Sequence, residues 1–327
     1  MRMKMLAATA AAAALAVSGC QAPGTSASAD AGSFEDLRIM VPNSPGGGYD
    51  TTARTAAQVM DTENLTPPVE VFNLDGAGGT VGLARMMTEE GDGNLMMLMG
   101  LGVVGSVYTY KSDSTLQDTT PIARIVSEPE TIVVPADSPY DSLDELVKDW
   151  KANPRQMPVG GGSSPGGPDH LAPHMLAHEV GITPSDVNYV TYDGGGPLLA
   201  ALLGGEVEFG ITGVGEIRDQ IESGALKVLG VTSPERLPGL DARTLTEQGI
   251  DLQFTNWRGL VAPPGISDAQ RDALIKLVEK LFKTKGWKQA MAKNGWTPAL
   301  LPGQKFEDFI ASENQRVEDI LAKLGLV

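Results

Sequence analysis

The chain of 327 residues contains a single cysteine, Cys20. One cysteine excludes an intrachain disulfide and any CxxC metal or redox site. Basic residues are also few: 25 Lys and Arg stand against 41 Asp and Glu, so the formal net charge is −16. A field of that sign repels phosphate backbones, and we expect no nucleic-acid partner. No segment after the first twenty residues is apolar enough to suggest a membrane span.

The remaining composition is that of a folded protein. Hydrophobic residues make up 42% and charged residues 20% of the chain, which argues against disorder. The length suggests two domains of ordinary size. Glycine is abundant, at 39 residues, and glycine-rich turns can bring bare backbone amides close to a ligand.

The first residues have the pattern of an export signal. Arg2 and Lys4 precede the apolar run 6–17, which is too short to cross a bilayer as a helix. Val-Ser-Gly-Cys, ending at Cys20, resembles a bacterial lipobox. We therefore predict a lipoprotein signal peptide at 1–19, lipidation of Cys20, and a flexible Ser/Ala/Gly-rich tether at 20–33. The alternative is ordinary cleavage that leaves a free cysteine. The expected location is extracytoplasmic, with the chain lipid-anchored to the cell membrane.

From residue 34 onward, strand-like and helix-like segments alternate, which is typical of an α/β protein. Ser142 is a predicted N-cap, and Ser267 with Gln270 forms a capping-box pattern. The predicted strands are 37–41, 69–73, 95–99, 122–125, 131–134, a strand that begins at 157, 188–192, 208–212, 227–232 and 257–262. The predicted helices are 50–60, 81–89, 141–151, 197–203, 216–223, 267–283, 286–293 and 304–324.

One device recurs: a strand, a glycine-rich turn, then a helix. Because a helix N-terminus has unpaired N–H groups and a partial positive charge, several such turns around one crevice would bind an anion without any arginine. Between Arg155 and Arg218 there is no Lys or Arg at all. The alternative is that the glycines only punctuate turns. The four turns are 44–49, 75–79, 160–167 and 193–196.

Two sequence motifs typical of enzymes are present, but the elements that would have to accompany them are not predicted. Gly-Leu-Gly-Val-Val-Gly at 100–105 matches the dinucleotide fingerprint, but no long crossover helix is predicted after it. Gly-Ser-Ser-Pro-Gly at 162–166 matches a nucleophile elbow, which needs a histidine far downstream. The last histidine is His178. We expect neither a Rossmann site nor a hydrolase, and we expect no enzyme activity and no cofactor.

The three histidines, His170, His174 and His178, are spaced by four residues. Such spacing can hold zinc on one helix face. A proline is tolerated only in the first turn of a helix, however, so we expect regular helix to begin near Pro173 or after it. We predict no metal site. Asp50 and Arg54 are also four apart, so Asp50 is either half of a helix-surface ion pair or a residue that faces the crevice.

A series of motifs resembles the substrate-binding receptors of tripartite tricarboxylate transporters, also called Bug-type receptors. The resemblance covers nearly the whole chain after the tether, and it is carried by the order and spacing of the motifs. These are VPNSPGGGYD (41–50), NLDGAGGTVG (73–82), PIARI (121–125), GGSSPGGPDHLA (161–172), YDGGGP (192–197), LLGGEVE (202–208), VTSPER (231–236) and NWRGLVAPPG (256–265).

The resemblance implies a fold like that of type II periplasmic binding proteins, with two α/β domains and the ligand in the cleft between them. Domain 1 would comprise 34–136 and 233–327, and domain 2 would comprise 137–232. Backbone amides of two loops would hold carboxylates. Asp193 and Arg258 depart from the common pattern, which leaves the ligand open, and Arg258 either supplies a cation or points to solvent. The implied binding residues are Asn43, Ser44, Gly46, Gly47, Gly48, Tyr49 and Asp50 on one side, and Ser163, Ser164, Gly166, Gly167 and His170 on the other.

The function implied is that of a monomeric solute-binding lipoprotein. It would capture a small di- or tricarboxylate, citrate-like first, and deliver it to membrane permease subunits of a tripartite transporter. The alternative is a carboxylate-sensing receptor that acts on a signalling protein without transport.

Overall fold

The computed structural model describes residues 34–327. The predicted signal peptide, Cys20 and the tether lie outside the described residues. Within 34–327 no helix combines the length and the apolar character that a membrane span requires.

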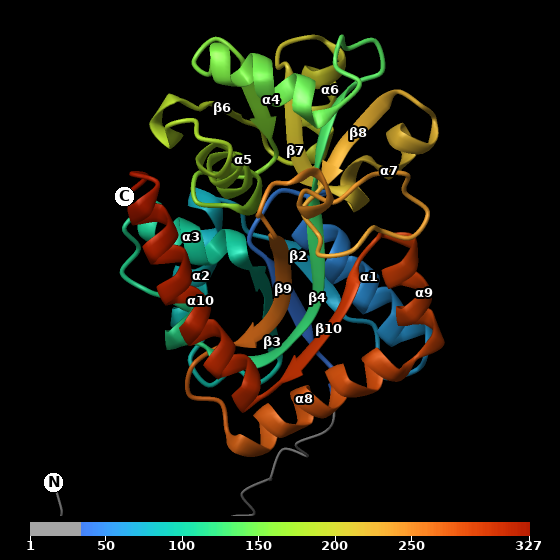
Figure 1. Ribbon diagram of the computed structural model, residues 1–327. Helices are drawn as coiled ribbons and strands as arrows, with labels where there is room; N and C mark the ends of the chain where they lie inside the picture. Colours follow the sequence, from blue (N-terminus) through green and yellow to red (C-terminus); the bar gives the residue numbers. More distant parts are fainter. Residues whose placement is uncertain (1–33) are drawn as a thin grey trace, which may run out of the picture.

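The predicted α/β alternation is confirmed, and ten strands form one continuous sheet with two lobes (Figure 1). The strand order is β2-β1-β3-β9-β4-β7-β5-β6, and β8 and β10 both pair with β4. The first lobe contains β1 (Arg38–Val41), β2 (Glu70–Asn73), β3 (Leu95–Gly100), β9 (Thr255–Ala262) and β10 (Thr297–Pro302); the second contains β5 (Pro158–Gly161), β6 (Asn188–Thr191), β7 (Phe209–Gly213) and β8 (Leu226–Val231).

The strand β4 (Thr120–Pro135) belongs to both lobes. Its first part pairs antiparallel with β9 and β10, and its last part pairs antiparallel with β7 and β8. In each lobe the strands farther from β4 are parallel: β1 pairs with β2 and β3, and β5 pairs with β6 and β7. Parallel strands place the loops that follow them at one edge of the sheet.

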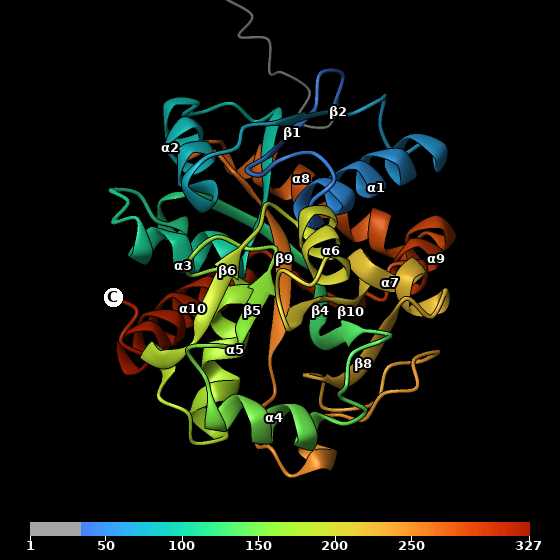
Figure 2. The same cartoon turned by 90° about the horizontal axis from the view of Figure 1, so that it is seen from above.

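Helices cover both faces of the sheet. In the first lobe α1 and α9 lie on one side and α3 and α10 on the other, as Figures 1 and 2 show. The first lobe carries α1 (Gly48–Thr62), α2 (Thr80–Thr88), α3 (Leu101–Thr109), α8 (Asp268–Lys283), α9 (Lys285–Lys293) and α10 (Gln304–Lys323); the second carries α4 (Leu143–Ala152), α5 (Pro168–Glu179), α6 (Gly195–Leu203) and α7 (Val214–Glu222).

The predicted caps are confirmed. The Ser142 hydroxyl accepts from the N–H of Glu145, and the Ser267 hydroxyl accepts from the N–H of Gln270, each within a complete capping box. Such a cap contributes about 1 kcal/mol by giving an orphan N–H a partner.

Two predictions about elements are wrong, and two elements of the structure were not predicted. The segments 122–125 and 131–134 are one strand, β4. No predicted element corresponds to α3, which begins directly after Gly100, or to β10. Pro173 does not limit the helix, since α5 runs through it. Every residue of α5 before Met175 is buried, and this packing offsets the hydrogen bond that the proline cannot make.

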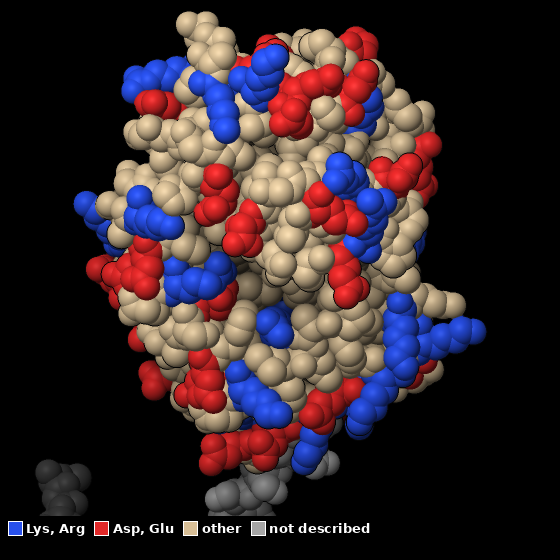
Figure 3. Space-filling view, viewed as in Figure 1, with Lys and Arg blue, Asp and Glu red and all other residues tan. Residues whose placement is uncertain are grey.

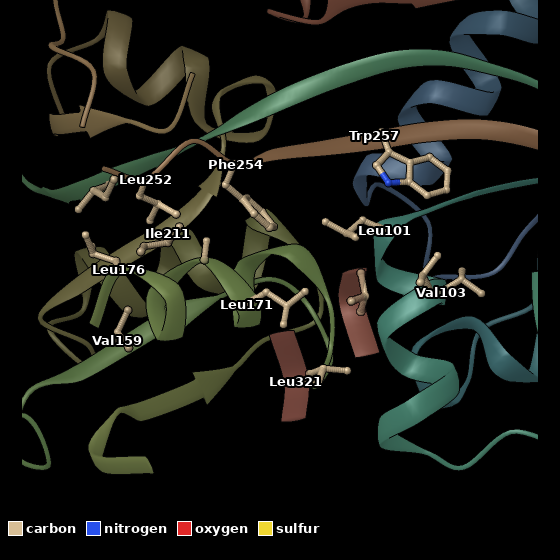
Figure 4. Packing of buried hydrophobic residues seen from close by; sticks show 14 of the residues in the cluster. Leu101, Val103, Val159, Leu171, Leu176, Ile211, Leu252, Phe254, Trp257 and Leu321 are labelled. Atoms are coloured by element: carbon tan, nitrogen blue, oxygen red, sulfur yellow. The ribbon is translucent and has the colours of Figure 1, made fainter. Parts of the chain in front are cut away.

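The hydrophobic core is continuous between the lobes. Every residue of β3 is buried, and one cluster joins Leu101, Val103 and Trp257 of the first lobe to Val159 and Ile211 of the second. Figure 4 shows Leu171 of α5 and Leu321 of α10 lying between these two groups. The lobes are therefore linked by packed side chains as well as by β4. The predicted domain limits, at 34–136 with 233–327 and at 137–232, stay a prediction.

Candidate functional site

A cavity of about 420 Å³ lies between the two lobes. Four glycine-containing turns line it, two from each lobe, and all four were identified in the sequence as strand–turn–helix junctions. They are the segment after β1, the turn that begins at Asp75, the segment after β5 and the turn that begins at Asp193. The four turns thus surround one cavity, which is the arrangement that would bind an anion, and anion binding itself stays a prediction.

The two longest turns are built alike. Ser44-Pro-Gly-Gly47 precedes α1, and Ser164-Pro-Gly-Gly167 precedes α5. The third residue of each has a positive φ, +88° at Gly46 and +87° at Gly166, which glycine adopts without strain. The fourth residue is the helix N-cap, with φ and ψ of −72° and 171° at Gly47 and −74° and 170° at Gly167.

Each of these turns is held by a side chain of the helix that follows it. Asp50 accepts a hydrogen bond from the N–H of Gly46 at 2.9 Å, and His170 Nδ1 accepts one from the N–H of Gly166 at 3.1 Å. The two acceptors stand at the same place in the two motifs, four residues after the donor. The loops are therefore two copies of one device, facing each other across the cavity.

The sequence left two interpretations of Asp50 open, half of an ion pair or a residue that faces the crevice. Its buried carboxylate pairs with Arg54 at 2.9 Å, and it also accepts from Asn73 Nδ2 at 2.9 Å. Burial opposes its ionisation, but the hydrogen bonds from Arg54, Gly46 and Asn73 outweigh it and lower the pKa of Asp50. The ion pair exists, and the same carboxylate fixes the first loop.

His170 is neutral in this setting. Burial and the neighbouring His174 lower the pKa of His170 to about 3. The ring of His170 packs 4.9 Å from that of Tyr189, and the Tyr189 hydroxyl donates to the carbonyl of Ser163 at 2.9 Å. Both residues thus bond to the second loop and hold it in place.

The second loop is tied to α5 by a further carboxylate. Asp169 accepts from the N–H of Gly162 and from the hydroxyl of Ser163, both at 2.8 Å. Burial, although opposed by those hydrogen bonds, raises the pKa of Asp169. On the other side of the cavity, burial raises the pKa of Tyr49 to about 12, and its hydroxyl oxygen accepts from the N–H of Gly102 at 3.0 Å.

Arg258 is not directed to solvent. It is 2% exposed, and its guanidinium donates to Glu128 at 2.6 Å and to the hydroxyl of Thr52 at 3.2 Å. Glu128 also accepts from the N–H of Gly215, so one carboxylate of β4 links β9 of the first lobe to α7 of the second. Burial and the charges of Asp169 and Glu128 raise the pKa of the nearby Glu216 to about 8.

The lobes touch beside the cavity. The Ser44 hydroxyl lies 2.7 Å from a carboxylate oxygen of Asp193, and the Thr109 hydroxyl donates to the carbonyl of Pro165 at 2.9 Å. Both contacts join the first lobe to the second.

Eight of the twelve predicted binding residues line the cavity, and four do not. Gly46, Asp50, Gly166 and His170 are outside the lining, although they hold the loops that supply it. A direct role of these four in binding stays a prediction. The eight that line the cavity are Asn43, Ser44, Gly47, Gly48, Tyr49, Ser163, Ser164 and Gly167.

The remaining lining residues come from the two shorter turns, from α3 and from neighbouring segments. Gly102 is the middle glycine of the dinucleotide-like motif, and its small size serves the close approach of Tyr49. Asn256 and Arg258 come from β9, in the NWRG segment. The glycine turns themselves were a usable signal for Asp75 and Asp193. The lining residues that are not among the twelve predicted binding residues are Pro42, Asp75, Gly76, Ala77, Gly78, Gly102, Ser106, Gly162, Pro168, Asp169, Thr191, Tyr192, Asp193, Gly194, Glu216, Asn256 and Arg258.

Within residues 34–327 no group of three or more His, Cys, Asp or Glu side chains is arranged to hold a metal ion. The rings of His170 and His174 pack at a tilt of 45°, with centroids 4.4 Å apart, and His174 Nδ1 lies 2.6 Å from the carbonyl of His170. The pair is engaged with its own helix.

Comparison with known proteins identifies the family of the chain. The family model described as the tripartite tricarboxylate transporter family receptor matches residues 52–326. The chain belongs to this receptor family. The family is one of solute-binding receptors, not of enzymes.

Individual relatives span nearly the whole receptor chain. Protein BugT of Bordetella pertussis is 28% identical over 321 residues, which is 95% of each chain. The structure of periplasmic binding protein BugD superposes with a TM-score of 0.79 at 26% identity, covering 89% of this receptor and 97% of BugD. An R. palustris protein solved with adipate has the same fold, with a TM-score of 0.80 at 21% identity, covering 89% and 97% of the two chains. The predicted fold class, two α/β domains of the periplasmic binding protein type, is confirmed.

Proposed function

We propose that this receptor is an extracytoplasmic lipoprotein that captures a small di- or tricarboxylate, citrate-like first, and delivers it to the membrane permease of a tripartite transporter. The observation that carries the proposal is the pair of equivalent Ser-Pro-Gly-Gly loops, each ending at a helix N-terminus and each facing the same cavity. N–H groups in the first turn of a helix lack intrahelical partners and favour anions.

Two facing loops of this kind suit a ligand with a carboxylate at each end. One carboxylate would bind the first loop and the second would bind the loop before α5. Because the loops belong to different lobes, a ligand that contacts both stabilises the arrangement in which the lobes touch. The adipate found in a protein of the same fold is a dicarboxylate and supports this class of ligand.

A thermal-unfolding screen of the purified protein tests the proposal. The panel is citrate, tricarballylate, succinate, glutarate, adipate, terephthalate, glutamate and nicotinate, each with and without Mg²⁺. A ligand at a hundred times its Kd stabilises the folded state by about 2.7 kcal/mol, and the expected result is such a shift with at least one aliphatic carboxylate. If no carboxylate shifts the transition, the proposal is wrong.

Ser164→Ala separates the receptor from a hydrolase. Ser164 lies in the cavity, and the expected result is a change in affinity with no ester hydrolysis by either protein. Hydrolysis by the purified protein that Ser164→Ala abolishes would contradict the receptor assignment.

The membrane anchor is tested separately through Cys20. The unaltered protein is expected to sediment with membranes, and Cys20→Ser is expected to remain in the soluble fraction. If the variant still sediments with membranes, the lipid anchor is not at Cys20.

A further inference from the structure

The charges around the cavity are unusual for an anion site. Five charged side chains line it, and four of them are acidic: Asp75, Asp169, Asp193 and Glu216. The fifth is Arg258, whose guanidinium already donates to Glu128. Two of the acids are accounted for inside the protein, since Asp169 is tied to the second loop and burial raises the pKa of Glu216 to about 8. Asp75 Oδ1 accepts from the N–H of Gly76 at 2.7 Å, but among the hydrogen bonds of the described residues Asp75 Oδ2 and the Asp193 carboxylate meet only the Ser44 hydroxyl.

Asp75 and Asp193 approach each other from different lobes. The Ser44 hydroxyl lies 2.8 Å from Asp75 Oδ2 and 2.7 Å from Asp193 Oδ2. A hydroxyl has one proton and donates it to one acceptor at a time. Two exposed carboxylates therefore share a single hydrogen atom at the edge of the cavity.

No basic side chain balances this pair. Among the residues that the structure describes, the ion pairs include neither Asp75 nor Asp193. Figure 3 shows that elsewhere on the face in view acidic and basic side chains are interspersed on both lobes. Like charges brought together on the two lobes oppose their approach unless a cation joins them.

A second observation concerns buried oxygen atoms in the same cavity. Ser106 Oγ and Asn256 Oδ1 belong to residues that are 1% and 6% exposed, and neither atom has a hydrogen-bond partner. Both side chains line the cavity. A Cβ on Gly78 would overlap Ser106 Oγ, so this hydroxyl lies against the turn that begins at Asp75. A buried polar atom without a partner costs free energy. The Ser106 hydroxyl could donate to a carboxylate, but Asn256 Oδ1 can only accept, and a plain carboxylate has no donor to offer it.

We propose that Asp75 and Asp193 recognise a positive charge, so that the ligand is a carboxylate accompanied by a cationic centre at the edge of the cavity. The cationic centre is either an ammonium group of the ligand or a divalent cation that the ligand chelates. It lies between the two carboxylates and links the lobes, while the loop amides hold the carboxylate. An ammonium group has three N–H donors, and a chelated divalent cation keeps bound waters that donate to oxygens such as those of Ser106 and Asn256. This inference rests on the proposed capture of carboxylates.

Matched ligands test it by isothermal titration calorimetry. L-Aspartate differs from succinate, and L-glutamate from glutarate, by one ammonium group; these pairs are titrated in EDTA. Citrate is titrated in EDTA and in excess Mg²⁺. We expect at least one cation-bearing member to bind about tenfold tighter than its partner, the scale of a hydrogen-bonded charge pair. A preference for the amino acids identifies an ammonium, and a Mg²⁺-dependent preference identifies a divalent cation.

The variants Asp75→Asn, Asp193→Asn and the double variant then assign the preference to these two side chains. Both residues are exposed, so the amides fit without repacking. Each single variant is expected to reduce the preference, and the double variant to abolish it. Asp272→Asn makes the same charge change at an exposed position of α8 and is expected to leave the preference unchanged.

The outcomes separate this inference from the proposed function. If the unaltered protein binds the plain anion as tightly as its partner, or if the double variant keeps the preference, the inference is overturned while carboxylate capture stands. If only the double variant binds the plain anions, the two carboxylates exclude them, which supports the inference. If neither protein binds any of these carboxylates, carboxylate capture fails and the inference fails with it.

Discussion

Gly105 of α3 and Gly166 of the loop before α5 meet backbone to backbone across the boundary between the lobes. A Cβ placed on Gly105 would overlap the carbonyl oxygen of Gly166, and a Cβ on Gly166 would lie 2.5 Å from the carbonyl carbon of Gly105. Because neither glycine has a side chain, the two backbones are in direct contact. This contact places the loop before α5, which belongs to the second lobe, directly against α3 of the first lobe.

Gly105→Ala is expected to weaken ligand binding by about tenfold or more while leaving the fold of each lobe intact. The added methyl group keeps the lobes apart, whereas alanine inside a helix is favoured over glycine by about 1 kcal/mol. Titration calorimetry gives the affinity, and urea unfolding without ligand gives the stability. Gly196→Ala is the matched control, because Gly196 lies in α6 with open space around it. Equal affinities of the two variants would contradict the role of the Gly105–Gly166 contact.

Arg258→Met is expected to destabilise the protein by about 3–5 kcal/mol, because it leaves a buried carboxylate without its partner. The carboxylate is that of Glu128, which is 1% exposed. Adding Glu128→Gln to the variant removes the charge, so the double variant is expected to recover much of the loss. Urea unfolding of the unaltered protein and the three variants completes a double-mutant cycle. Additive losses would show that the two side chains do not interact.

Glu130 is a buried carboxylate of a different kind. It is 0% exposed, and neither of its carboxylate oxygens has a hydrogen-bond partner. Burial, together with the charges of Asp169, Glu128 and Glu216, raises the pKa of Glu130 well above the usual 4.5. The folded protein therefore keeps a proton that the unfolded chain releases above about pH 4.5. The contribution of Glu130 to stability falls as the pH rises through that value.

Glu130→Gln removes this contribution and is expected to make the protein more stable at pH 8 than the unaltered chain, with a smaller difference at pH 4. The free energy of unfolding in urea, measured at both pH values, gives the comparison. Glu208→Gln, at an exposed position in the same lobe, is the control and is expected to have the same effect at both. A Glu130→Gln difference that does not depend on pH would show that Glu130 is ionised in the folded state.

The sequence predicts the parts of this protein that depend on local physics. Capping residues at Ser142 and Ser267 mark helix starts because their hydroxyls bond within one turn. The glycine turns are recognisable because each follows a short apolar strand and precedes a helix. The twelve binding residues that the family resemblance implies lie on or beside two of these turns, and eight of them line the cavity.

Other features depend on contacts between distant residues. The sequence does not show that β4 is one strand, because Glu128, Pro129 and Glu130 interrupt its apolar pattern. The buried charge of Glu128 is tolerable because it pairs with Arg258, which is 130 residues away. Asp75 and Asp193 are 118 positions apart in the sequence, and tertiary structure alone brings both to Ser44. His170 was expected to face the ligand, but its partner is the N–H of Gly166, four residues earlier.

The equivalence of the two loops gives Asp50 and His170 the same task by different chemistry. Each accepts the N–H of the glycine with positive φ and so fixes the direction in which the loop amides point. Asp50 does this as an anion and His170 as a neutral ring. A preorganised loop loses less conformational entropy when it binds a ligand than a free one.

Asp50→Ala is accordingly expected to weaken carboxylate binding by about tenfold, because the N–H of Gly46 loses its acceptor and the loop samples other conformations. Asp61→Ala, at an exposed position of the same helix, is the control and is expected to bind as the unaltered protein does. Since the folded pKa of Asp50 is lowered, its carboxylate stabilises the fold fully above the unfolded pKa near 3.8 and ceases to do so as the pH falls through the folded value. Affinity measured at pH 5 and pH 8 is therefore expected to show no Asp50-dependent change, and the deficit of Asp50→Ala relative to Asp61→Ala should be the same at both. An undiminished affinity of Asp50→Ala would mean that the first loop keeps its shape without this carboxylate.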